Sequence, residues 1–137
     1  MDLNFVDADT LDFDPRTYLR ILVAIAKADK DNGLPEFDYV RRQAERLGLD
    51  SEQYFKSTDK TFSIGHQTVS RLTALVILKD AIGLASLDGN LSLPERMKIF
   101  TYAEKLDISR NDVDQLEQLL DAYRQLDARW RQLVDAC

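Results

Sequence analysis

The chain has few of the residues that usually carry enzyme chemistry. Its 137 residues include one histidine, His66, and one cysteine, Cys137. A catalytic triad or a histidine zinc site would have to use His66, and the linker around it supplies no partners, so an exposed linker side chain is the simpler interpretation. Glycine-rich phosphate loops, nucleophile elbows and paired-cysteine motifs are also missing. The sequence therefore predicts a protein that is not an enzyme, and a lone cysteine is typical of a reducing cytoplasm.

Basic charge and long apolar runs are scarce as well. The 18 basic and 24 acidic residues give a net charge of −6, whereas a nucleic-acid-binding protein needs a basic face. The most apolar stretch, Leu72 to Leu87, is interrupted by Lys79 and Asp80, and it is too short and too charged to span a bilayer. The N-terminus lacks the basic and apolar segments of a signal peptide. These features favour a protein partner over nucleic acid or membrane.

Glycine and proline are few, and strand signals are nearly absent, so the pattern predicts helices. Asp14-Pro15 is a good helix start, Gly48 a good helix end, and Ser109 with Asp112 a good cap for a long last helix. Apolar residues recur at steps of three and four between these signals. We expect an all-α single domain of six to seven helices over residues 15–137. Its helices are expected at about 15–28, 35–48, around Tyr54 and Phe55, 67–87, 94–106, and from 109 onward.

Residues 1–14 form an acidic arm ahead of this domain. Five aspartates precede the first basic residue, with Leu3, Phe5, Leu11 and Phe13 between them. The apolar residues would allow the arm to lie extended over the core, and the aspartates would equally suit a frayed tail.

An internal repeat organises the domain. Residues 19–50 match residues 78–109 at a constant offset of 59, with nine identities that include Ala26/Ala85 and Pro35/Pro94. Two such units would bury their apolar faces against each other around a pseudo-twofold axis. The repeats then cover about 15–56 and 67–137, joined by a linker at 57–66. Small residues in the two buried helices would let those helices cross closely. These residues are Ala24 and Ala26 in the first helix, and Gly83 and Ala85 in the second.

Both repeats carry acidic residues at the same turn, just after the buried helix. They are Asp29, Asp31 and Glu36 in the first copy, and Asp88 and Glu95 in the second. Oxygen ligands of this kind suit Ca²⁺ or Mg²⁺, and a cation would relieve the repulsion between carboxylates and a helix C-terminus. The register of an EF-hand fails, because position 12 counted from Asp29 is Val40 rather than glutamate. A structural interpretation stays open, since acidic residues also cap helices and form loops.

The two turns and the junctions that follow the next helices resemble those of the tellurite-resistance TerB-like family. The matching elements are a Pro-Glu helix start, at Pro35-Glu36 and Pro94-Glu95, and the junctions Leu47-Gly48-Leu49-Asp50 and Leu106-Asp107-Ile108-Ser109. The resemblance implies an all-helical domain that binds a divalent metal through acidic residues and acts as a scaffold in a bacterial stress response. Lys30 departs from the family pattern and would weaken the first half of such a site.

Two hypotheses about function follow. In the first, the chain is a TerB-like domain that binds Ca²⁺ or Mg²⁺ through its paired acidic turns. In the second, the acidic turns are structural, and the chain is a helical interaction module whose last helix or N-terminal arm docks a protein partner.

Overall fold

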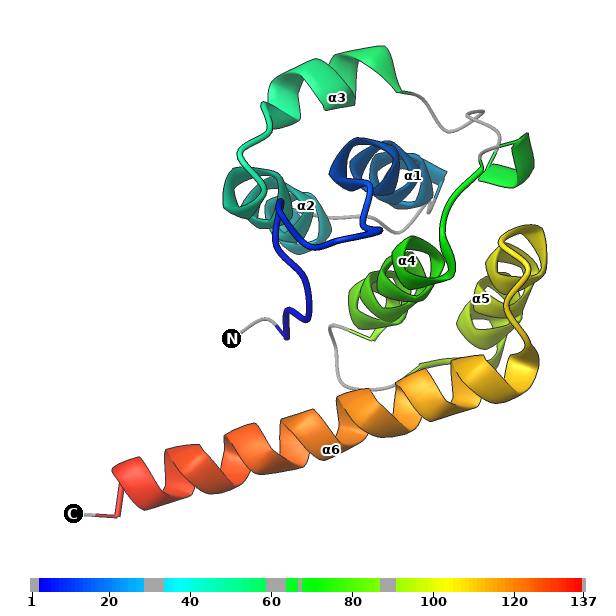
Figure 1. The fold of residues 1–137 in the computed structure, drawn as a ribbon. Helices are drawn as coiled ribbons and strands as arrows, with labels where there is room; N and C mark the ends of the chain where they lie inside the picture. Colours follow the sequence, from blue (N-terminus) through cyan, green and yellow to red (C-terminus); the bar gives the residue numbers. More distant parts are fainter. Residues whose placement is uncertain (1–2, 29–33, 59–63, 67, 87–90, 137) are drawn as a thin grey trace.

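A computed structural model describes residues 3–28, 34–58, 64–66, 68–86 and 91–136 (Figure 1). Within these ranges the chain is all-helical and contains no strand, as the sequence predicts. The elements are α1 (Pro15–Ala28), α2 (Leu34–Arg46), α3 (Ser51–Ser57), the short 3₁₀ helix η1 (Ile64–His66), α4 (Arg71–Ala85), α5 (Leu93–Lys105) and α6 (Arg110–Val134).

The centre of the fold is the pair α1 and α4, which lie side by side (Figure 1). Helices α2 and α3 pack on α1, and helices α5 and α6 pack on α4. Both central helices are apolar on most of their surface, so most of their residues are buried. The largest fully buried side chains lie on these two helices and include Tyr18, Leu19, Ile77 and Leu78.

Side-chain caps set the helix starts. Ser109 accepts a hydrogen bond from the backbone amide of Asp112 at the start of α6, as predicted. The start predicted for the fourth helix is wrong, because α4 begins at Arg71 rather than near Gln67. The Ser70 side chain accepts from the Thr73 amide there, which fixes the first turn at that point. Helix α4 also ends two residues before the predicted end, at Ala85.

The second and fifth helices begin and end at positions that are 59 residues apart. Helix α2 spans Leu34–Arg46 and α5 spans Leu93–Lys105, so both bounds are shifted by 59. The chain leaves both helices through the same backbone turn, in which the amides of Leu49 and Ile108 donate 2.9 Å bonds to the carbonyls of Ala44 and Ala103. Gly48 and Asp107 occupy the same left-handed position, at φ 72° and 61°. The agreement ends beyond these turns, because α3 has 7 residues and α6 has 25.

The described part of the N-terminal arm lies against the helices. Val6 and Phe13 are buried in the core. Arg46 of α2 donates to the carbonyl of Val6, and Lys79 of α4 donates to the carbonyl of Leu3 at 2.5 Å. Of the two interpretations of the arm, the extended segment over the core is therefore the one that residues 3–14 adopt.

Candidate functional site

The structure describes two of the five predicted metal ligands. Asp29, Asp31 and Asp88 lie outside the described residues. Glu36 and Glu95 lie in the first turns of α2 and α5, and both are half-buried. Glu95 closes a capping box, since its Oε1 accepts from the Ser92 amide at 3.0 Å and its own amide donates to Ser92 Oγ at 3.2 Å. That is the structural role which the sequence also allowed for this residue.

No group of three or more Asp, Glu, His or Cys side chains suited to a metal occurs among the described residues. The side chain of His66 and all of Cys137 also lie outside them.

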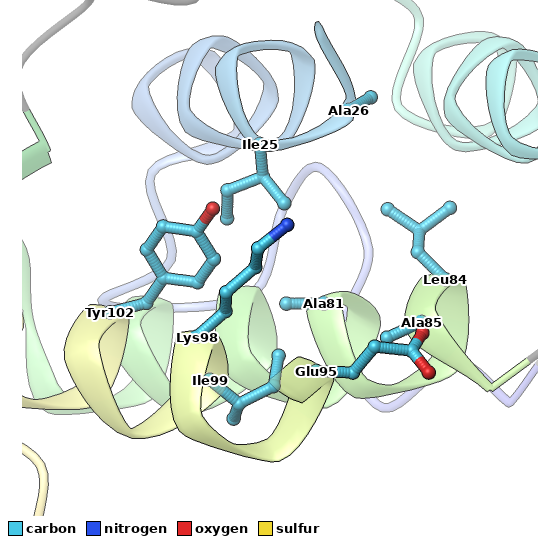
Figure 2. Close-up of a pocket in the computed structure, with 9 residues that line it drawn as sticks. All are labelled: Ile25, Ala26, Ala81, Leu84, Ala85, Glu95, Lys98, Ile99 and Tyr102. Carbon is cyan, nitrogen blue, oxygen red and sulfur yellow. The ribbon is translucent and has the colours of Figure 1, made fainter. Parts of the chain in front are cut away.

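A small hollow lies where α1 and α4 end beside α5 (Figure 2). Its lining includes the pairs Ile25/Leu84 and Ala26/Ala85, which the offset of 59 relates to each other. The ends of the two central helices therefore line the same hollow, where Ala26 is buried and Ala85 is half-buried. Gly83 does not contribute to this approach, because a Cβ added there would meet nothing within 4 Å. The small residue of α4 that lines the hollow and is buried is Ala81.

The hollow is too small to be a substrate pocket. Its volume is about 40 Å³, which is room for one or two water molecules, whereas ligand pockets measure roughly 300–1,000 Å³. Its walls are mostly aliphatic. The polar groups come from α5, where Lys98 and Tyr102 extend towards α1 and the Glu95 carboxylate lies beside Ala85 (Figure 2). The hollow can admit one or two water molecules beside Glu95 and little else.

A buried polar cluster, which the apolar pattern did not predict, joins three helices. Asp80 of α4 is 1% exposed and accepts hydrogen bonds from the hydroxyls of Tyr18 and Tyr39, the latter at 2.5 Å. Lys79 is 3% exposed and its Nζ lies 2.8 Å from Asp80 Oδ1. The sequence signal for this cluster is the pair Lys79-Asp80 inside an otherwise apolar stretch.

The cluster is built to hold the fold together. Burial, followed by the nearby Asp80 carboxylate, raises the pKa of Tyr18 well above its ordinary value of 10.0. Tyr18 therefore stays protonated and donates to the carboxylate at neutral pH. Lys79 balances the charge of Asp80 and also lies 5.6 Å from the ring centre of Phe5 in the arm. These contacts tie α1, α2, α4 and the arm to one carboxylate.

The last helix carries an exposed apolar surface. Val113, Leu116 and Leu120 are buried against α4 and α5, and the helix then extends beyond both of them (Figure 1). Leu119, Leu126, Trp130 and Leu133 are 52%, 65%, 58% and 70% exposed. We call these four residues the α6 stripe. The side chain of Trp130 is exposed because α6 extends beyond the rest of the domain at that point.

Comparison of the chain with models of known protein families, with curated proteins and with solved structures gives no match. In the part of the chain that the structure describes, no helix has both the length and the apolar character needed to cross a bilayer.

Proposed function

We propose that this chain is a non-enzymatic helical interaction module, and that the α6 stripe is its docking surface. The observation that supports this proposal is the exposure of the four stripe residues on one helix. Single exposed apolar residues are ordinary on protein surfaces, but a contiguous row of large ones usually marks a contact with another molecule.

The way α6 is held supports the same proposal. Its first turns are anchored by buried Val113, Leu116 and Leu120, and by the ion pair of Glu117 with Arg96 at 2.5 Å. A helix of 25 residues is about 37 Å long, so the body covers only part of it. An anchored helix presents the stripe with little loss of conformational entropy on binding.

A second candidate is the cation-binding role of a TerB-like scaffold acting in the cytoplasm under stress. The meeting of the ends of α1 and α4 at one hollow, with Glu95 in its wall, favours this candidate. The matching turns after α2 and α5 fit an internal duplication, which the TerB-like resemblance also implies. The cation candidate and the docking surface involve different parts of the molecule and are compatible with each other.

The docking surface is tested by site-specific photo-cross-linking in cells. A photoreactive residue replaces Leu126 in the stripe, and a matched control replaces Gln125, which is exposed next to it. The proposal expects one defined cross-linked product from position 126 and none from position 125. The product is identified by mass spectrometry and its binding repeated with purified components. An absence of product at 126, or equal products at both positions, would contradict the proposal.

A further inference from the structure

We infer that the partner of the α6 stripe is the same stripe on a second copy of this chain, packed antiparallel. This inference rests on the proposed function, since it names the occupant of the proposed docking surface.

The spacing of the stripe is that of a coiled coil. Leu119, Leu126 and Leu133 are seven residues apart, Trp130 lies between the last two, and half-buried Tyr123 lies on the same line. These positions alternate in steps of four and three, which is a repeat of 3.5 residues rather than the 3.6 of a straight helix. A row with this repeat can pack along a second helix, as the core positions of a coiled coil do.

The area available is enough for a pair of copies. The exposed parts of the stripe residues and of Val134 amount to roughly 100 Å² for each side chain, so each copy offers on the order of 500 Å². Two copies would bury about 1,000 Å², which is the lower bound for a specific interface. A reversible dimer is therefore expected.

The charges along α6 favour the antiparallel arrangement. Residues 110–121 carry one arginine and four acidic residues, of which Asp112 and Glu117 pair with arginines of α4 and α5. Residues 122–134 carry three arginines and one aspartate, a net charge of +2. Antiparallel packing lays the negative half of one helix along the positive half of the other, and it also opposes the helix dipoles. Parallel packing would place the two positive halves together. In the antiparallel register Leu119 faces Trp130 of the other copy, and Tyr123 faces Leu126.

The oligomeric state of the full chain tests the inference. Sedimentation of the purified protein should give twice the mass of 15.7 kDa at high concentration, with dissociation on dilution. Fluorescence of Trp130, the single tryptophan, should shift to shorter wavelength as the dimer forms. The double variant Leu126→Asp with Leu133→Asp should be monomeric at every concentration. The matched control, Gln125→Asp with Gln132→Asp, adds the same charge at exposed positions off the stripe and should stay dimeric.

Circular dichroism checks that both double variants are still folded, because both should melt as helical proteins.

The relative orientation of the two α6 helices is determined from disulfide formation in a Cys137→Ser background. Leu119→Cys should cross-link to a chain carrying Trp130→Cys and not to itself, and self-cross-linking at 119 would indicate the parallel arrangement and overturn the antiparallel one. A monomer at all concentrations would overturn the inference. If the chain is monomeric but position 126 cross-links to a different protein, the proposed docking function still holds. If position 126 gives no cross-linked product, both the docking function and the dimer are contradicted.

Discussion

Asp80 is the residue on which the buried polar contacts converge. Its carboxylate takes hydrogen bonds from two tyrosines and an ion pair from Lys79, and all four side chains are buried. A buried charge is tolerated only when it is paired and hydrogen-bonded. The cluster adds little net energy over apolar packing, but it makes each member dependent on the others.

Removal of the Asp80 carboxylate should be strongly destabilising. Asp80→Ala leaves the Lys79 ammonium without its counter-charge and removes the carboxylate that accepts from the Tyr18 and Tyr39 hydroxyls. We expect a loss of about 3–5 kcal/mol in the free energy of unfolding, measured by urea denaturation. Asp38→Ala is the control, because Asp38 forms a 3.2 Å pair with Arg41 at the surface and should cost less than about 1 kcal/mol. Equal costs for the two variants would show that the cluster does not behave as a buried network.

Stability at high pH should depend on Tyr18. Its pKa in the folded protein is raised well above 10.0, so the unfolded chain loses the phenolic proton first as pH rises. The contribution of Tyr18 is therefore intact below about pH 10 and is lost above it, by about 1.4 kcal/mol per pH unit until the folded pKa is reached. Tyr18→Phe should remove that part of the slope. Urea denaturation of both proteins between about pH 9 and pH 11, a window around the ordinary tyrosine pKa, measures the difference. Identical slopes would contradict this assignment.

The turns that follow helices α2 and α5 can be compared directly, because the chain passes through a left-handed residue in each. This residue is Gly48 at φ 72° after α2 and Asp107 at φ 61° after α5. Glycine adopts this conformation at no steric cost, whereas a side chain is strained there by about 1–2 kcal/mol. The space around Gly48 is open, since an added Cβ would meet nothing within 4 Å. Any loss of stability when Gly48 is replaced therefore comes from the backbone conformation and not from a steric clash.

Exchanging the two residues should change stability in opposite directions. Gly48→Asp should lower the free energy of unfolding by about 1 kcal/mol, and Asp107→Gly should raise it by a few tenths to about 1 kcal/mol. Thermal melting of the single variants and of the double exchange measures both effects, and the double exchange should lie close to the wild type. A loss of stability in Asp107→Gly would mean that the aspartate makes a contact that outweighs its backbone strain.

The elements that the sequence predicted well are those defined by local chemistry. The cap at Ser109 and the end of α2 before Gly48 depend on residues a few positions apart. The Asp80 cluster was missed because its tyrosines come from helices 41 and 62 residues away in sequence. No local pattern distinguishes a buried Lys79-Asp80 pair from an exposed one. The start of α4 was missed because the apolar pattern was followed past the cap at Ser70.

In the whole molecule, α6 shows that a periodic apolar pattern does not by itself tell which residues are buried. Leu116 and Leu126 occur in one unbroken helical pattern, yet Leu116 is 8% exposed and Leu126 is 65% exposed. The difference is set by where the body ends, which depends on the lengths of α4 and α5 and on how they cross α6. Sequence could therefore predict an apolar helix here, and only the fold shows which part of it is available to a partner.

Cation binding near the ends of α1 and α4 is testable on the stability of the whole domain. A cation that binds only the folded chain adds about 2.7 kcal/mol at 100 times its dissociation constant, so Ca²⁺ or Mg²⁺ should raise the melting temperature by several degrees. Asp29→Asn combined with Asp88→Asn should abolish the rise. The matched control is Asp38→Asn with Asp114→Asn, which removes the same charge at exposed positions elsewhere and should keep it. The acidic turns are structural if neither cation changes the melting temperature of the wild type and the Asp29→Asn, Asp88→Asn variant is at least as stable as the wild type. Docking through α6 then remains as the proposed function of the domain.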